Sequence, residues 1–184
     1  MAALSRFISK LDEKALSFYR LMKKADKFEW TPEAQAAFDK LKQVLSTSPV
    51  LVTPHEQEPM LLYIAATTQV VSTVLVVERE EEGKIHGVQR QVYYLSEVLT
   101  PAKQRYPHYQ KLAYAVWRTA DKLRHYFMEH PIIVVSEAPM KNILTNPDAT
   151  GRVSQWVIDL SPRSITYVHR TAIKSQVLPD FFVD

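Results

Sequence analysis

One long amphipathic helix constrains the fold of this chain more than any other feature. Between Pro107 and Met128 the apolar residues recur at steps of three and four, which predicts a single helix of about six turns with one continuous apolar stripe. Tyr106-Pro107 suits its start, because proline fits the first helical turn. Lys122 and Arg124 lie near its expected end, where cations complement the helix dipole. A helix of this kind needs a large apolar surface to cover.

Apolar runs typical of β-strands lie on both sides of the helix and supply that surface. The expected strands span residues 60–65, 70–77, 88–95, 132–136 and 164–169, and further helices are expected at 139–144, 153–160 and 173–182. Residues 66–69 and the charged stretch 78–84 read as the turns between the first three strands. The sequence therefore predicts an α/β fold with a five-stranded mixed sheet flanked by helices, in the element order of the ribonuclease H fold.

The first fifty residues have a different pattern. Residues 2–24 predict an amphipathic helix, with a break near Asp12 allowed for, and a second helix begins at Thr31-Pro32, a capping residue followed by proline. Residues 46–49 (Ser-Thr-Ser-Pro) end that helix. We expect a small helical segment over 1–50 and the main domain over 51–184.

Composition excludes several classes of function. The chain has 184 residues, a formal net charge of +3 and no cysteine, so disulfides, thiolate metal sites and cysteine nucleophiles are excluded. No apolar run reaches the length of about 18 residues that a membrane span needs. The sequence also shows no secretory signal, glycine-rich phosphate loop, paired metal-binding histidines or nucleophile elbow. We expect an intracellular protein of the cytoplasm, a virus-like particle or the nucleus.

Several motifs resemble one family in the order in which they occur. They are Phe28-Glu29-Trp30-Thr31, Ala37-Phe38, Leu41-Lys42, Pro49-Val50-Leu51, Leu62-Tyr63-Ile64-Ala65-Ala66-Thr67, Val92-Tyr93-Tyr94-Leu95-Ser96, Arg105-Tyr106-Pro107, Leu123-Arg124-His125-Tyr126-Phe127 and Gly151-Arg152. The chain resembles the Pol polyproteins of gypsy-type (Metaviridae) LTR retrotransposons, in particular a plant Tat-like lineage. By this resemblance residues 1–50 are the helical end of the reverse-transcriptase thumb or connection, and residues 51–184 are an RNase H-like domain.

The resemblance also identifies the positions where the family places its catalytic acids. RNase H chemistry uses four carboxylates that hold two Mg²⁺ ions about 3.5–4 Å apart. Carried over by position, these acids fall on Ala65, Leu112, Glu137 and Asp180. Two of the four offer no oxygen ligand, so the resemblance implies a degenerate site with no intact catalytic set and no cofactor. Glu137 and Asp180 are the candidate ligands for a single Mg²⁺ ion if any residual activity exists.

Three functions follow from a degenerate site. In the first, the domain is a structural connection module that supports an RNA–DNA or DNA duplex and joins the polymerase domain to a downstream RNase H or integrase. In the second, it retains RNase H endonuclease activity on RNA–DNA hybrids. In the third, it is a domesticated host protein-binding domain. The sequence leaves open whether the chain is a polyprotein fragment or a stand-alone gene product.

Basic residues are the candidate contacts to nucleic-acid phosphates, because such contacts give affinity without sequence preference. The candidates are Arg6, Lys10, Lys23, Lys24, Lys122, Arg124, Arg152 and Arg170. The alternative is that these cations form ordinary solvated helix faces or complement helix dipoles.

Overall fold

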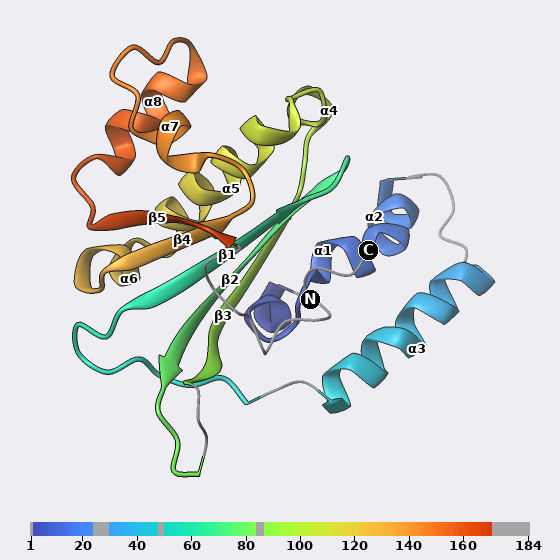
Figure 1. The fold of residues 1–184 in the computed structure, drawn as a ribbon. Helices are drawn as coiled ribbons and strands as arrows, with labels where there is room; N and C mark the ends of the chain where they lie inside the picture. Colours follow the sequence, from blue (N-terminus) through green and yellow to red (C-terminus); the bar gives the residue numbers. More distant parts are fainter. Residues whose placement is uncertain (1, 24–29, 48–49, 84–86, 171–184) are drawn as a thin grey trace.

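The apolar runs form the five strands of one mixed sheet in the computed structural model, which describes residues 2–23, 30–47, 50–83 and 87–170 (Figure 1). The strand order is β3-β2-β1-β4-β5. Strands β1, β2 and β3 are antiparallel neighbours, whereas β4 and β5 run parallel to β1. Their bounds are β1 (Met60–Ala66), β2 (Val70–Arg79), β3 (Val88–Val98), β4 (Ile132–Ser136) and β5 (Ile165–His169). The predicted five-stranded mixed sheet is confirmed.

Helix α5 (His108–Lys122) covers one face of this sheet and contacts β1 and β2 (Figure 1). Side chains alternate across a strand, so Leu62 and Ile64 join the core under α5, while Leu61 and Tyr63 join a second cluster on the other face. The remaining helices on the α5 side are α4 (Pro101–Gln104), α6 (Arg124–Glu129), α7 (Met140–Leu144) and α8 (Arg152–Leu160). The helix predicted at 173–182 lies outside the described residues.

The predicted continuous helix over 107–128 is wrong at Leu123, where the backbone turns to φ −110° and ψ 41° and separates α5 from α6. A continuous helix would pair the Ala120 carbonyl with the N–H of residue 124. Instead, Arg163 Nη1 donates to the Ala120 oxygen at 2.9 Å. Leu123 at the break and Phe127 in α6 both belong to the core. A side chain inserted into the helical hydrogen-bond pattern is an established cause of such a break.

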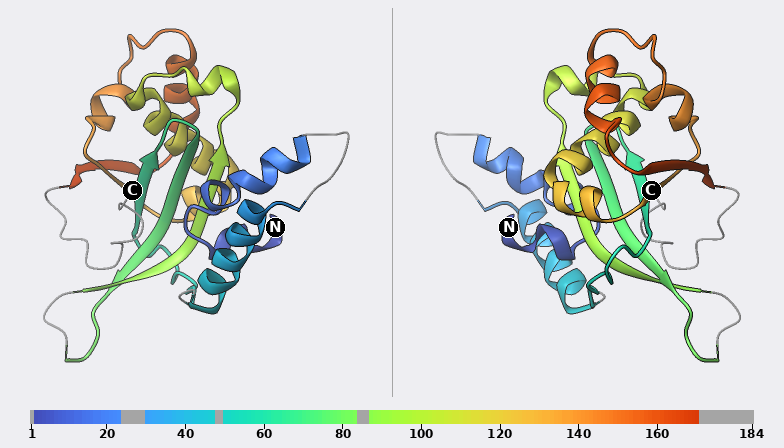
Figure 2. Two further views of the ribbon diagram at one scale, coloured as in Figure 1. Left: turned by 90° about the vertical axis from the view of Figure 1, so that its right-hand side faces the viewer. Right: turned by 90° about the vertical axis from the view of Figure 1, so that its left-hand side faces the viewer.

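The amino-terminal segment packs on the opposite side of the sheet, next to β3 (Figure 2). Its elements are η1 (Ala2–Phe7), α1 (Leu11–Lys14), α2 (Leu16–Lys23) and α3 (Pro32–Thr47). The helix predicted over 2–24, with a break allowed for near Asp12, is divided into η1, α1 and α2. Lys10 adopts a left-handed φ of 50°, and the Asp12 N–H donates to Ser96 Oγ on β3 at 3.0 Å. The Asp12 N–H thus bonds to the sheet and not to a preceding helical carbonyl.

Helix α3 begins as its sequence predicts, because Thr31 Oγ1 accepts a hydrogen bond from the Ala34 N–H at 3.2 Å. Ile8, Leu11 and Leu41 form a small apolar cluster that joins α3 to the preceding elements. Within the described ranges, no helix is both long enough and apolar enough to cross a membrane.

A two-point ion pair fixes the loop that leads into β1. Arg79 at the end of β2 donates Nε to Glu58 Oε1 and Nη2 to Glu58 Oε2, each at 2.8 Å. The same guanidinium donates to the Thr53 carbonyl at 2.9 Å, and the His55 N–H donates to Glu58 at 2.7 Å. The hydrogen bonds from Arg79 outweigh the effect of burial and lower the pKa of Glu58 to about 2.

We expect Glu58 to make the fold more stable at neutral pH than in acid. Its folded-state pKa is depressed, so its contribution is present above its unfolded pKa and is lost as the pH falls from about 4.5 to about 2. Glu58→Gln should lower the free energy of unfolding at pH 7 by about 1–3 kcal/mol and remove this part of the acid dependence. Urea titrations at several pH values measure both effects. Glu81→Gln, in the more exposed Arg90–Glu81 pair, is the matched control and should change stability by less than about 1 kcal/mol; equal effects would contradict the assignment.

Candidate functional site

A hollow of about 350 Å³ lies where β1 and β4 end, beside the first turns of α5. Because β1 and β4 are parallel neighbours, their carboxyl ends meet at the same edge of the sheet. The hollow is lined by Ile64, Ala65, Ala66, His108, Leu112, Val135, Ser136, Glu137, Ala138 and Arg170. Three of the four positions predicted from the family's acids, Ala65, Leu112 and Glu137, therefore lie around one space. The fourth, Asp180, lies outside the described residues.

Apolar side chains occupy two of these positions. Leu112 is only 6% exposed and belongs to the main core with Val116 and Phe127. Ala65 packs against the apolar cluster on the other face of the sheet. Neither residue can ligate a cation. The walls of the hollow are consequently apolar over most of their extent.

Glu137 is the acid that lines the hollow, and it is already paired with a cation. Its Oε1 accepts a hydrogen bond from Arg170 Nη1 at 2.7 Å. The Glu137 side chain is 71% exposed and that of Arg170 is 33% exposed. Ion pairs with this exposure contribute at most about 1 kcal/mol. The pair therefore orients Arg170 toward the hollow without binding it tightly to Glu137.

The residues around the hollow do not fit a two-magnesium site. Mg²⁺ requires hard oxygen ligands in near-octahedral geometry, and paired ions require several carboxylates. Among the residues that the structure describes, the lining offers the single carboxylate of Glu137. Across the described part of the chain, no three histidine or acidic side chains lie close enough together to hold a metal ion.

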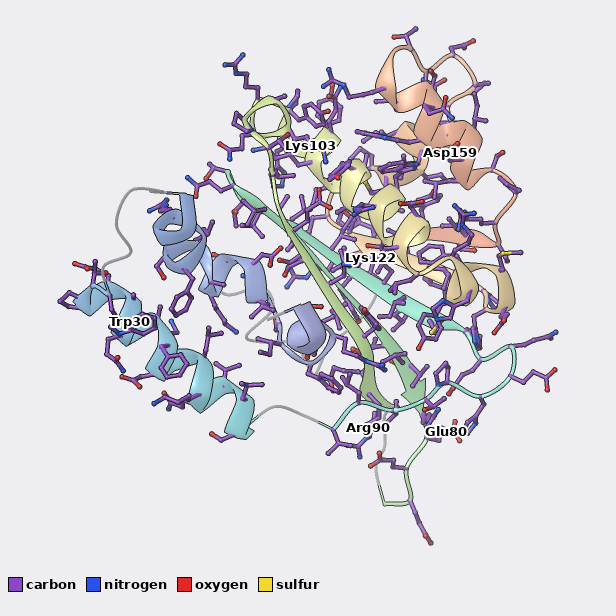
Figure 3. All side chains as sticks on the ribbon, turned by 180° about the vertical axis from the view of Figure 1, so that it is seen from behind. Trp30, Glu80, Arg90, Lys103, Lys122 and Asp159 are labelled. Carbon is purple, nitrogen blue, oxygen red and sulfur yellow. The ribbon has the colours of Figure 1, made fainter. Side chains whose placement is uncertain are left out.

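The predicted phosphate contacts do not form one cluster. Lys122 and Arg124 are exposed around the break between α5 and α6, and Arg124 contacts Asp121 at 3.5 Å (Figure 3). Arg152 lies nearer the hollow, over the Tyr106 ring at 4.1 Å and 3.5 Å from Gln110 on α5. Arg170 lines the hollow itself.

The candidate phosphate contacts in the amino-terminal segment differ from one another in their exposure. Arg6 lies over the rings of Phe7 and Tyr93 at 5.3 and 5.4 Å and remains exposed. Lys10 is only 8% exposed and has a left-handed backbone, so little of its surface is open to a phosphate. Lys23 ends α2, and Lys24 lies outside the described residues.

Sequence reasoning missed the partners of two further cations in the α4–α5 region. Glu97 on β3 accepts hydrogen bonds from Lys103, which is labelled in Figure 3, at 3.0 Å, from Tyr114 at 2.6 Å and from Arg118 at 2.6 Å. Burial alone would raise the pKa of Glu97, but these three donors outweigh it and the pKa is lowered. Lys103 and Arg118 therefore stabilise the fold, and a count of basic residues in this region overstates the charge available to a ligand.

His108 is the second feature that sequence reasoning missed. It lines the hollow together with Leu112, four residues later on α5. That spacing is a usable signal, because residues four apart share a helix face.

Comparison with known proteins identifies the family of this chain. The matching family model is described as an RNase H-like domain found in reverse transcriptase, and the match covers residues 30–134. The chain belongs to this family.

Curated relatives of this reverse-transcriptase domain are retroviral. The chain is 30% identical over 136 residues to the Gag-Pol polyprotein of Woolly monkey sarcoma virus and 31% identical over 136 residues to that of Gibbon ape leukemia virus. Each match covers 72% of this chain and 8% of the polyprotein, so the chain spans a small part of the length of these relatives.

Solved structures with the same fold come from a foamy virus. The foamy viral protease-reverse transcriptase in complex with an RNA/DNA hybrid has a TM-score of 0.72 and 19% identity, over 97% of this chain and 24% of that one. The foamy viral protease-reverse transcriptase dRH in complex with double-stranded DNA has a TM-score of 0.71 and 19% identity, over 97% of this chain and 31% of that one. The predicted ribonuclease H-like fold is confirmed.

We expect the Leu112 position to tolerate a carboxylate poorly. Leu112→Glu places an unpaired carboxylate in the core and should lower the free energy of unfolding by about 3–5 kcal/mol. Tyr109→Glu, at an exposed position of the same helix, is the matched control and should cost less than about 1 kcal/mol. Chemical denaturation compares the two variants. Equal stability of the two would show that Leu112 is not packed as described.

Proposed function

We propose that this reverse-transcriptase domain is a catalytically inactive RNase H-like module that works as a connection between the polymerase and a downstream nuclease. The observation that supports this most directly is the chemistry of the hollow. Alanine and leucine occupy two positions of the family's acids, and the one lining acid is paired with an arginine. Loss of two metal ligands should abolish two-ion catalysis, since loss of outer partners alone costs about 10–100-fold.

A role in holding the template–primer duplex is the second part of the proposal. Exposed cations at Lys122, Arg124 and Arg152 can contact backbone phosphates, which gives affinity for any sequence. The foamy viral protease-reverse transcriptase with this fold is known in complex with double-stranded DNA and with an RNA/DNA hybrid. Similarity of fold makes the same class of ligand the first to test here.

Protein contacts are the third part. Trp30 and Phe38, which are 48% and 42% exposed, pack edge-to-face at the start of α3, and Trp30 also packs against Phe18 of α2 at 5.9 Å, so a partly exposed aromatic surface forms there. A surface of this kind suits another protein segment. We infer that the neighbouring polymerase domain and a downstream RNase H or integrase of the same polyprotein are its partners, in an intracellular particle. A gypsy-type, Tat-like origin of the polyprotein belongs to the same proposal.

Two alternatives make different predictions. Residual RNase H activity would use Glu137, Asp180 and a bound Mg²⁺ ion. A domesticated host protein would use the aromatic surface of α3 to bind a cellular partner and would need no duplex.

We expect no hydrolysis of the RNA strand of a labelled RNA–DNA hybrid in Mg²⁺ or Mn²⁺. The variant Ala65→Asp/Leu112→Glu/Glu137→Asp restores the family's acids and is the informative comparison. It should be less stable than the natural chain without Mg²⁺ and should regain stability when Mg²⁺ is added, because a ligand that binds only the folded state stabilises it. Hydrolysis by the natural chain that disappears in Glu137→Gln would support residual nuclease activity instead.

We expect duplex binding to weaken steeply with salt and to show no sequence preference. In Lys122→Gln/Arg124→Gln, the slope of log affinity against log salt should fall by about two units. Fluorescence anisotropy with an RNA–DNA hybrid and with double-stranded DNA measures this slope. Lys42→Gln, which removes an exposed cation from α3, is the control and should leave the slope unchanged. Undetectable binding at low salt would contradict the duplex role and favour the host-protein alternative.

A further inference from the structure

The hollow at the ends of β1 and β4 has the features of a phosphate site. Arg170 lies at its mouth with the guanidinium held by Glu137 at 2.7 Å. His108 lines the same space from α5. Arg170 and His108 therefore bring a cation and a hydrogen-bonding side chain to the space where the family's acids would gather negative charge.

Two backbone carbonyls in the turn after β1 already accept hydrogen bonds from a buried lysine. Lys111, which is 6% exposed, donates Nζ to the carbonyls of Thr67 and Thr68 at 3.3 and 3.1 Å. These residues follow Ala66 in the turn after β1. A buried ammonium group therefore already occupies the carbonyls of this turn. Glu137 is the acid in the lining that would oppose an approaching anion.

The apolar walls increase the effect of these charges. Ile64, Leu112 and Val135 displace water from one side of the hollow, and Coulomb interactions strengthen as the local dielectric falls. Arginine is suited to phosphate, because its planar guanidinium can donate two parallel hydrogen bonds to two phosphate oxygens.

We propose that this hollow binds one backbone phosphate of the duplex directly, and that Arg170 exchanges Glu137 for that phosphate. This inference rests on the proposed duplex-binding function. Glu137 competes with the phosphate for the same guanidinium. The exchange is energetically accessible because the exposed pair contributes little, whereas a charge-assisted bidentate contact to phosphate is stronger. No metal ion takes part in the contact.

Two substitutions at the pair should change affinity in opposite directions. Arg170→Gln removes the phosphate ligand and should weaken binding of an RNA–DNA hybrid by about tenfold, with a salt slope about one unit smaller. Glu137→Gln removes the competitor and should tighten binding by about two- to fivefold. Misfolding cannot produce the second result. Anisotropy titrations at fixed ionic strength measure both, and thermal melts confirm folding of the variants.

The Arg90–Glu81 pair provides the matched control at the other end of the sheet. It is also an exposed arginine–glutamate pair, next to the β2–β3 hairpin (Figure 3). Arg90→Gln and Glu81→Gln make the same changes in net charge, and both should leave hybrid affinity within about twofold. If substitutions at the two pairs changed hybrid affinity equally, net charge alone would explain the result, and the proposed phosphate site would be wrong.

Titrations with and without Mg²⁺ separate the remaining outcomes. If Glu137 were a metal ligand, Mg²⁺ would strengthen binding beyond its ionic-strength effect and Glu137→Gln would remove that gain. We expect Glu137→Gln to tighten binding equally in both buffers. If the natural chain binds no hybrid, the duplex function itself fails. If it binds but Arg170→Gln and Glu137→Gln have no effect, the phosphate site fails and the duplex function stands.

Discussion

Packing of α5 against β1 and β2 is the interaction on which the rest of this domain depends. Leu112, Val116 and Ala120 face the sheet within the main core, and burial of such side chains contributes about 1–3 kcal/mol each. A buried hydrogen bond of 2.9 Å between Thr73 on β2 and Thr119 on α5 fixes how the helix sits on the sheet. Thr119 is fully buried, so an unpaired hydroxyl there would be costly. Once α5 is fixed, its first turns form one wall of the hollow and its end receives α6 and α8.

In our proposal, the same packing also explains how this fold persists without the family's metal-binding acids at positions 65 and 112. A carboxylate at position 112 would need a metal ion or another partner to compensate for its burial, whereas leucine adds to the core. Alanine at position 65 on β1 likewise needs no metal ion, because its side chain carries no charge. The arginine that follows β5, Arg170, contacts the remaining acid, Glu137. In our proposal, the family's site binds metal cations, whereas the hollow of this chain presents the cationic side chain of Arg170.

Some basic residues of the chain stabilise the fold and are not available to a ligand. Lys103 and Arg118 both bind Glu97, and Lys111 holds the turn after β1, so these residues stabilise the α4–α5 region against the sheet. Exposed cations such as Lys122, Arg124 and Arg152 remain for contact with a polyanion. Net charge read from the sequence does not distinguish these two groups, because the distinction depends on which acids are brought near by folding.

The sequence by itself determined the five strands, α3, α7, α8 and the helical character of 108–122, since period and capping residues act locally. It also determined that Ala65 and Leu112 cannot ligate a metal, because that follows from residue type alone. Tertiary structure decided where helices stop: Arg163 reaches the Ala120 carbonyl from 43 residues away, and the contact of Asp12 with Ser96 accompanies the broken amino-terminal helix. It also decided that Lys10 is buried and that Arg170 meets Glu137 across 33 residues. Contacts between distant segments depend on how α5 and the sheet pack, and no local pattern records them.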